Sequence, residues 1–225
     1  MSQFFVLHYN LEEDLPWLEP FFKLWKRFSE ISGECFAMSS PNKKSDTPFP
    51  VSFWVIPGTL LAGQYPRNEG EEDSKEKLRQ LLTIGQVNHI IDLTESGEKN
   101  YVSVPLQPYD ELLNRVSKEL SWFCTVERMP IQDRNVPSQK EMNAILNAID
   151  EHRSKGKRVY IHCWGGHGRT GTVIGCYLIR HKMVEKDAVF ERIIELRQAI
   201  TDPVRRDFPS PETDEQRDFV LNWAW

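Results

Sequence analysis

A short apolar strand, a glycine-rich loop and an apolar helix follow one another directly between residues 159 and 179. Val159-Tyr160-Ile161 leads straight into the stretch His162-Cys163-Trp164-Gly165-Gly166-His167-Gly168-Arg169-Thr170-Gly171. Residues 173–179 are then apolar on nearly all sides, which is typical of a helix buried in the middle of a domain. Such a succession predicts an α/β fold.

The sequence from residue 51 onward supports this fold class, because strand patterns alternate with helical ones. We expect strands at 52–56, 90–93 and 122–129. Helices are predicted from near Ser74 to Gly85, over 189–200 and over 212–223. Another helix should begin at Ser138, which forms a capping box with Glu141 and leads an apolar face that runs to Ile149.

The first 50 residues differ from the rest and predict an N-terminal helical extension and linker. Residues 18–28 place apolar side chains at helical spacing, and residues 39–50 are rich in Ser, Pro, Asn and Lys. The extension is interpreted as an arm packed on the domain at 51–225, with a partner-binding or membrane-surface helix as the alternative.

Composition limits the ligands and the cellular location that we expect for the protein. The four cysteines are too few and too scattered for a disulfide scaffold, and none has C-x-x-C spacing, so no metal site is predicted. A net charge of −5 gives no general attraction for nucleic acid. Neither a signal-peptide pattern nor an apolar run of membrane-spanning length is recognised, so we expect a cytoplasmic protein without stable membrane insertion.

The glycine-rich loop predicts an anion site with a nucleophile at its base. Its glycines let the backbone N–H groups converge on a ligand, and the positive end of the following helix points to the same place. That environment favours a thiolate at Cys163. Arg169 can hold two phosphate oxygens with its planar fork, and the Thr170 hydroxyl can hydrogen-bond the sulfur.

A thiolate that displaces an alkoxide or phenoxide also needs a proton donor. The best candidate is Asp133, in the segment Met129-Pro130-Ile131-Gln132-Asp133-Arg134-Asn135-Val136-Pro137-Ser138. This segment follows a predicted strand and precedes a capped helix, so it is a loop that can close over a substrate. A turn or helix-capping aspartate is the alternative.

Together these stretches resemble the protein tyrosine phosphatases. HCWGGHGRTG matches the His-Cys-(five residues)-Arg-Ser/Thr signature of that family, and the segment around Asp133 is similar to the general-acid loop of its dual-specificity branch. The resemblance covers residues 50–225 and implies a central, mostly parallel sheet flanked by helices. It also implies a phosphocysteine intermediate on Cys163, with Asp133 as acid and then base, and no metal or cofactor.

The resemblance assigns phosphoryl binding to the loop that follows the nucleophile. The expected binding residues are Trp164, Gly165, Gly166, His167, Gly168 and Arg169, with Trp164 and His167 shaping the mouth of the pocket.

The segment Glu212-Thr213-Asp214-Glu215-Gln216 is similar to the glutamine loop that positions water in the tyrosine-specific branch. Glu212 stands where the first glutamine of that motif is expected. Gln216 is therefore the better candidate for positioning water, and a helix N-terminal turn is the alternative for both residues.

The substrate class stays open at this level. The loop from Trp164 to Gly168 contains no lysine, unlike phosphoinositide-directed relatives, which favours a phosphoprotein and phosphotyrosine first. A phosphoinositide, an inositol phosphate or another small phosphate ester is the alternative with the same chemistry. Other classes are a sulfurtransferase, an arsenate reductase and a non-catalytic phosphate-binding module.

Overall fold

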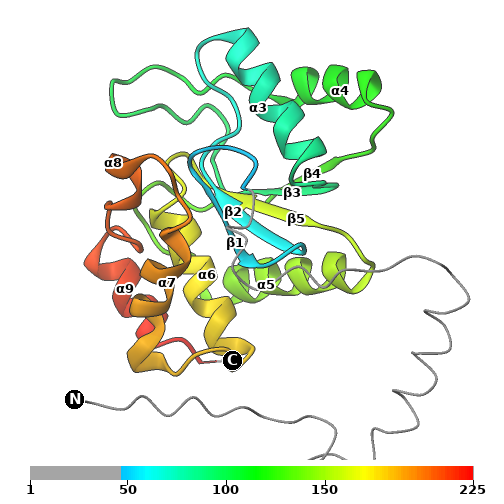
Figure 1. Ribbon diagram of the computed structural model, residues 1–225. Helices are drawn as coiled ribbons and strands as arrows, with labels where there is room; N and C mark the ends of the chain where they lie inside the picture. The colour runs from blue at the N-terminus through cyan, green and yellow to red at the C-terminus, as the bar shows by residue number, and fades with distance from the viewer. Residues whose placement is uncertain (1–46, 225) are drawn as a thin grey trace, which may run out of the picture. The chain divides into compact units, whose positions relative to one another are not determined.

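A five-stranded sheet lies at the centre of the residues that the computed structural model describes, 47–224 (Figure 1). The strands are β1 (Ser52–Ile56), β2 (Leu60–Gly63), β3 (His89–Asp92), β4 (Thr125–Arg128) and β5 (Val159–His162), in the order β1-β2-β5-β3-β4. β1 and β2 are antiparallel, and every other neighbouring pair is parallel. The mostly parallel sheet that the resemblance implied is confirmed.

Helices cover both faces of this sheet (Figure 1). β2, β3 and β5 are therefore buried, whereas the edge strand β4 is only partly buried. On one face lie α3 (Glu71–Thr83) and α4 (Asp110–Glu119). On the other lie α5 (Gln139–Ser154), α6 (Gly168–Arg180), α7 (Val189–Arg197) and α9 (Asp214–Leu221), with the short η2 (Lys186–Ala188) and α8 (Pro203–Arg206) between them in the chain. Side chains alternate along each strand, so Ile90 and Tyr160 join the first core and Ile91 and Ile161 join the second.

The parallel strands bring three loops to one edge of the sheet. β3, β4 and β5 run in the same direction, so the segments that follow Asp92, Arg128 and His162 all leave from their carboxyl ends. In open α/β sheets this edge is where ligands bind. The glycine-rich loop and the Asp133 segment are two of these three loops.

Most of the expected elements are present with shifted ends. The capping box at Ser138 is formed, since Ser138 Oγ accepts from the Glu141 backbone and the Glu141 carboxylate accepts from the Ser138 backbone. The strand expected over 122–129 is shorter, because Trp122 still closes the turn after α4 through its backbone bond to Ser117. α4 and α8 were not predicted, although Leu112, Leu113 and Val116 give α4 an apolar face at helical spacing. α8 has only four residues, too few for a periodic pattern.

The N-terminal helix lies outside the described residues, and the boundary near residue 50 stays a prediction. None of the helices within 47–224 combines the length and the apolar character that crossing a membrane requires.

Two glycines with positive φ differ in what surrounds them. Gly166, in the glycine-rich loop, has φ +76° and packs against the backbone of β2, where an added Cβ would lie 2.6 Å from the Gln64 nitrogen. Gly156, after α5, has φ +74° and open space around the same position. Only the first glycine is required by both conformation and close approach.

We predict that Gly166→Ala lowers the free energy of unfolding more than Gly156→Ala does. The shared left-handed conformation costs each variant about 1 kcal/mol. The clash with β2 adds about 1–3 kcal/mol at residue 166 alone. Urea unfolding of both variants measures the difference, and equal losses would show that the loop does not need its close contact with β2.

Candidate active site

Cys163 sits at the carboxyl end of β5, at the base of the glycine-rich loop. Its side chain is buried, and the Gly166 backbone N–H donates to its sulfur at 3.3 Å. The other described cysteines, Cys124 and Cys176, are buried in the cores, and burial raises the pKa of Cys124 to about 12 and that of Cys176 still further. Among the described cysteines, Cys163 is the one that lines a cavity together with polar side chains, Arg169 and Asp133 among them.

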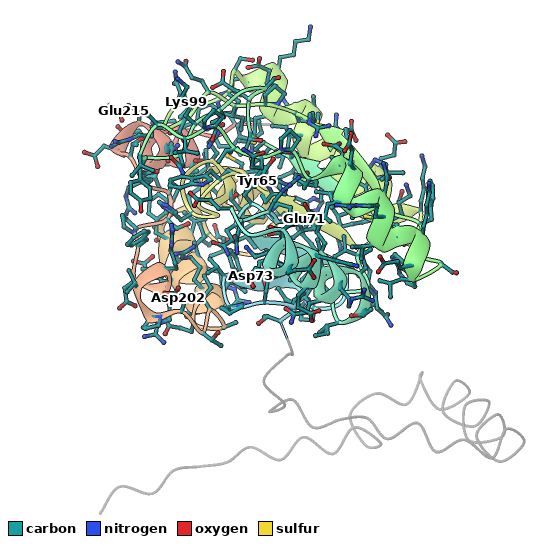
Figure 2. All side chains as sticks on the ribbon, turned by 90° about the horizontal axis from the view of Figure 1, so that it is seen from above. Tyr65, Glu71, Asp73, Lys99, Asp202 and Glu215 are labelled. Carbon is teal, nitrogen blue, oxygen red and sulfur yellow. The ribbon has the colours of Figure 1, made fainter. Side chains whose placement is uncertain are left out.

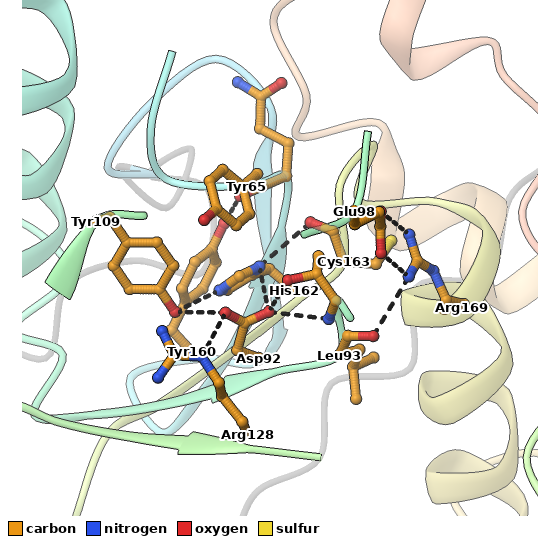
Figure 3. Close-up of polar contacts among 12 residues, drawn as sticks. Tyr65, Asp92, Leu93, Glu98, Tyr109, Arg128, Tyr160, His162, Cys163 and Arg169 are labelled. Atoms are coloured by element: carbon orange, nitrogen blue, oxygen red, sulfur yellow. Dashed lines mark hydrogen bonds and ion pairs between the residues drawn. The ribbon is translucent and has the colours of Figure 1, made fainter. Parts of the chain in front are cut away.

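Arg169 lies in the first turn of α6, with a guanidinium that is almost fully buried (Figure 3). Its Nη1 donates to the carbonyl oxygens of Ile131, at 3.0 Å, and Leu93, at 3.3 Å. Burial opposes its charge, but hydrogen bonding to Glu98 and the charges of Cys163, Glu98 and Asp133 raise its pKa above the ordinary value. The cation is thus fixed by groups from several loops.

Glu98 forms a bidentate ion pair with Arg169, a role that was not predicted from the sequence. Its two carboxylate oxygens each accept from the guanidinium at 2.7 Å, in a bidentate pair whose side chains are 5% and 2% exposed (Figure 3). Glu98 lies in the loop after β3. Its position beyond the carboxyl end of a predicted strand was the one available signal.

Asp133 reaches the same guanidinium from the loop after β4. Its Oδ1 lies 2.9 Å from Arg169 Nη2, and its side chain is 49% exposed. The backbone N–H of the buried Ile131 donates to Leu93 and holds the start of this loop against β3. The structure therefore brings Cys163, Arg169 and Asp133 together, as the sequence predicted.

A cavity of about 340 Å³ contains this group of residues. Cys163, Asp133 and Arg169 line it together with Trp164, Gly165, His167 and Gly168, as well as Lys99, Asn100, Tyr101, Arg134 and Glu212. Burial lowers the pKa of His167, although Glu212 opposes the shift, so the ring is neutral at pH 7. The loop residues expected at the pocket are thus at the cavity wall, apart from Gly166, which packs on β2.

Thr170 differs from its expected geometry. Its hydroxyl is buried in α6, and no hydrogen-bond partner for it is found within the described part of the chain. The expected bond to the Cys163 sulfur is not formed in this structure, and that sulfur accepts from the Gly166 N–H.

The side chain of Gln216 forms hydrogen bonds with the start of its own helix and with the loop that contains Asp133, residues 129–137 (the acid loop). Its side-chain oxygen accepts from the backbone of Glu212 at 3.0 Å and Thr213 at 3.3 Å, which completes the capping box of α9. Its amide nitrogen donates to the Asn135 carbonyl at 3.1 Å. Glu212, rather than Gln216, lines the cavity. The water-positioning role of Gln216 stays a prediction, and this geometry assigns the residue to joining α9 with the acid loop.

A buried polar network lies next to Cys163 on the side of β3 and α4 (Figure 3). The Tyr109 hydroxyl lies 3.1 Å from Asp92 Oδ2 and 3.0 Å from His162 Nε2. His162 Nδ1 lies 3.2 Å from the Cys163 carbonyl oxygen. Burial lowers the pKa of His162 and, with the Asp92 charge, raises that of Tyr109. Two neutral rings therefore fix the backbone at Cys163.

Arg197, from α7, supports the other side of the loop. Its guanidinium is buried and donates to the carbonyls of Gly166, at 3.3 Å, and Arg205, at 2.6 Å. Burial lowers its pKa to about 10, because its hydrogen bonds go to neutral carbonyls. Arg197 is a positioning residue that was not predicted from the sequence. A charged residue in an amphipathic helix is expected to lie on its solvent-exposed face, and nothing nearby in the sequence marks Arg197 as buried.

With this geometry established, residues 50–220 match the family described as "Swiss Army Knife protein, DSP-PTPase phosphatase domain". The chain belongs to this phosphatase-domain family. The predicted resemblance to the dual-specificity branch is thereby confirmed.

Curated relatives agree with this assignment. The phosphatidylglycerophosphate phosphatases PTPMT1 and PTPMT2 of Arabidopsis thaliana are 26% identical over 141 residues and 33% identical over 97 residues. These matches cover 60% and 42% of this chain and 41% of each relative. The chain therefore spans less than half the length of these relatives.

Solved structures share the fold. A kinase associated phosphatase with its catalytic-site cysteine changed to serine is 14% identical, with a TM-score of 0.54 over 76% of this chain and 90% of its own. PTPMT1 in complex with PI(5)P is 18% identical, with a TM-score of 0.51 over 75% of this chain and 94% of its own.

We predict that Glu98→Gln destabilises the fold, whereas Glu95→Gln in the same loop does not. Removing one partner of a buried ion pair costs about 3–5 kcal/mol, and the remaining Asp133 contact reduces the expected loss to about 2 kcal/mol. The Glu95 side chain is exposed, and only its backbone touches Glu98. Urea unfolding measures both, and a loss shared equally by the two variants would contradict this role for Glu98.

Proposed function

We propose that this chain hydrolyses phosphate monoesters through a phosphocysteine intermediate on Cys163. The observation that carries the proposal is the single cavity in which Cys163, Asp133 and Arg169 meet. A thiolate nucleophile, a proton donor and a fixed guanidinium are the groups that a metal-independent transfer from a phosphate monoester to sulfur needs.

In the first step the Cys163 thiolate attacks phosphorus, and the bond from phosphorus to the ester oxygen breaks. Asp133 transfers its proton to that oxygen, which leaves as an alcohol or phenol. Arg169 and the loop amides bind the phosphoryl oxygens as charge develops on them. In the second step water attacks phosphorus, Asp133 takes up its proton, and the bond between phosphorus and sulfur breaks to return the thiolate and release phosphate.

The resting contacts imply an exchange of partners when substrate binds. Asp133 pairs with Arg169 Nη2 in this structure, so a phosphoryl group that binds this nitrogen must displace the carboxylate. Glu98 holds the guanidinium throughout this exchange. The released and half-exposed Asp133 carboxylate takes up a proton from solvent and then faces the leaving oxygen, because it lines the same cavity.

For the substrate we propose a phosphoprotein, with phosphotyrosine favoured. Tyr101 and Trp164 stand at the cavity with ring centroids 5.6 Å apart and offer aromatic surface beside the phosphoryl site. Such a surface suits a phenyl ring. A reducing compartment such as the cytoplasm is part of this proposal, since the nucleophile must stay reduced.

A small polyanionic ester, such as an inositol phosphate or a phosphoinositide head group, is the second candidate. The loop itself has no lysine, yet Lys99 and Arg134 line the cavity from the two neighbouring loops. Beside it lies a second cavity of about 400 Å³, whose lining includes Arg67 and Arg205 (Figure 2 labels two more of its lining residues, Tyr65 and Glu71). The relatives named as phosphatidylglycerophosphate phosphatases support the same candidate.

The chemistry is tested with p-nitrophenyl phosphate and phenyl phosphate in the presence of a chelator. We expect no turnover by Cys163→Ser and a loss of about 100-fold in kcat by Asp133→Asn. The loss at Asp133 should be larger for phenyl phosphate, because its leaving group needs the proton more. Asp187→Asn, at an exposed position in η2, is the matched control. Turnover that survives Cys163→Ser would sink the mechanism.

The substrate class is tested by comparing a phosphotyrosine peptide with a soluble inositol phosphate. If the polyanionic ester is the substrate, Lys99→Gln and Arg134→Gln should raise its KM by about 10-fold and leave the peptide's KM within 2-fold. Lys118→Gln, in the last turn of α4, is the control for loss of a cation. If the peptide is turned over with the higher kcat/KM and neither variant changes the ratio, the phosphoprotein proposal stands.

A further inference from the structure

Two histidines and one glutamate form a cluster at the end of the sheet opposite to Cys163. His89 opens β3, Glu127 lies in β4, and His152 lies in the last turn of α5. Cys163 follows the carboxyl end of β5, whereas His89 pairs with Val159 at the start of that strand. Along the strands, His89 is therefore four residues away from the level of Cys163, roughly 13 Å.

Strand alternation explains why these three side chains meet. His89 and Ile91 share a face of β3, and Ile91 belongs to the core that α5 covers. His89 pairs with Thr125, and Ile91 pairs with Glu127, so both residues of β4 point to this same face. The side chain of His152, on α5, contacts both His89 and Glu127. The residues are 38 and 25 positions apart in the sequence, beyond the reach of any spacing motif.

Two distances in the cluster match those between the ligands of a tetrahedral metal. Glu127 Oε2 lies 3.4 Å from His89 Nε2 and 3.2 Å from His152 Nε2, and one ligand atom of each of the three residues lies within 4.8 Å of the other two. Zinc binds nitrogen and oxygen at about 2.0–2.2 Å, so the edges of a tetrahedral zinc site measure about 3.4 Å. Two of the edges already have this length.

Two buried nitrogens in the cluster, His89 Nε2 and His152 Nδ1, have no hydrogen-bond partner among the described residues. His89 is 3% exposed, and its Nε2 faces Glu127 without forming a hydrogen bond with any described residue. Its Nδ1 lies 2.7 Å from Thr125 Oγ1, the kind of contact that orients a metal-binding imidazole from outside the metal site. If Nδ1 donates to Thr125, Nε2 presents its lone pair to the carboxylate, an arrangement that a cation between them stabilises.

The two rings must separate before one ion can bind both. The imidazoles of His89 and His152 are stacked with centroids 3.4 Å apart, whereas two imidazoles on one tetrahedral zinc ion place their centroids about 5 Å apart. His152, whose side chain is 17% exposed, is the ring that can turn away. Two imidazoles and one carboxylate are a ligand set that zinc uses, with a fourth position left for water.

We propose that His89, Glu127 and His152 form a zinc site that joins the edge strand β4 to β3 and α5. The ion binds His89 Nε2, His152 Nε2 and Glu127 Oε2, with water as the fourth ligand. Its role is structural, because the site lies at the opposite end of the strands from Cys163. The site is independent of the phosphatase proposal and does not enter its chemistry.

Zinc binding is measured on the full chain by calorimetric titration after chelator treatment, in a Cys163→Ser background. That background removes a thiolate that could itself bind zinc. We expect one zinc ion per chain at this site, an affinity at least 10-fold lower in His152→Gln and Glu127→Gln, and a cobalt-substituted protein with tetrahedral visible absorption bands. His181→Gln is the matched control, since His181 pairs with Asp150 at 3.0 Å and no third ligand.

Absence of zinc binding, or equal binding by the parent, His152→Gln and Glu127→Gln, would overturn the proposal. Circular dichroism establishes that each variant is folded. Glu127 is 41% exposed, so Glu127→Gln provides a folded variant even where a histidine change disturbs packing. A zinc-dependent rise in Tm in the parent and in His181→Gln, lost in Glu127→Gln, supports the site by a second readout.

Discussion

The buried guanidinium of Arg169 is the interaction on which the site depends. A charge removed from water must be matched by close partners, and Arg169 has them in the two segments that follow the adjacent parallel strands β3 and β4. Glu98 and the Leu93 carbonyl come after β3, Asp133 and the Ile131 carbonyl come after β4, and Arg169 itself follows β5. The hydrogen bonds and ion pairs of this one guanidinium therefore fix the loops after β3 and β4 beside Cys163.

Arg169 and Arg197, the two buried arginines beside the glycine-rich loop, have different roles because their hydrogen-bond partners differ. Arg169 has carboxylates beside it, which raise its pKa and keep it charged. Arg197 donates to carbonyl oxygens, and burial lowers its pKa to about 10. The first can exchange an anionic partner for a phosphoryl group. The second holds the Gly166 carbonyl in place, and together with the His162 network it keeps the loop backbone from moving when that exchange occurs.

Charge at the cavity comes from more than the loop that carries the nucleophile. The loop from Trp164 to Gly168 has no lysine, which by itself favours a substrate with a single phosphoryl group. Lys99 and Arg134 nevertheless reach the same cavity from the other two loops. The inference drawn from loop composition is weakened for this reason, because electrostatic attraction depends on distance in space and not on distance along the chain.

The sequence by itself determined the α/β class, most of the strands and helices, and the group of Cys163, Asp133 and Arg169. These follow from local signals: apolar periodicity, a capping box, and glycines between a strand and a helix. Tertiary structure alone decided that Glu98 pairs with Arg169, that Gln216 binds the acid loop, and that the Thr170 hydroxyl stays apart from the sulfur. It also brought His89, Glu127 and His152 together. Such contacts arise when separate strands and helices pack, and no local pattern in the chain encodes which side chains then meet.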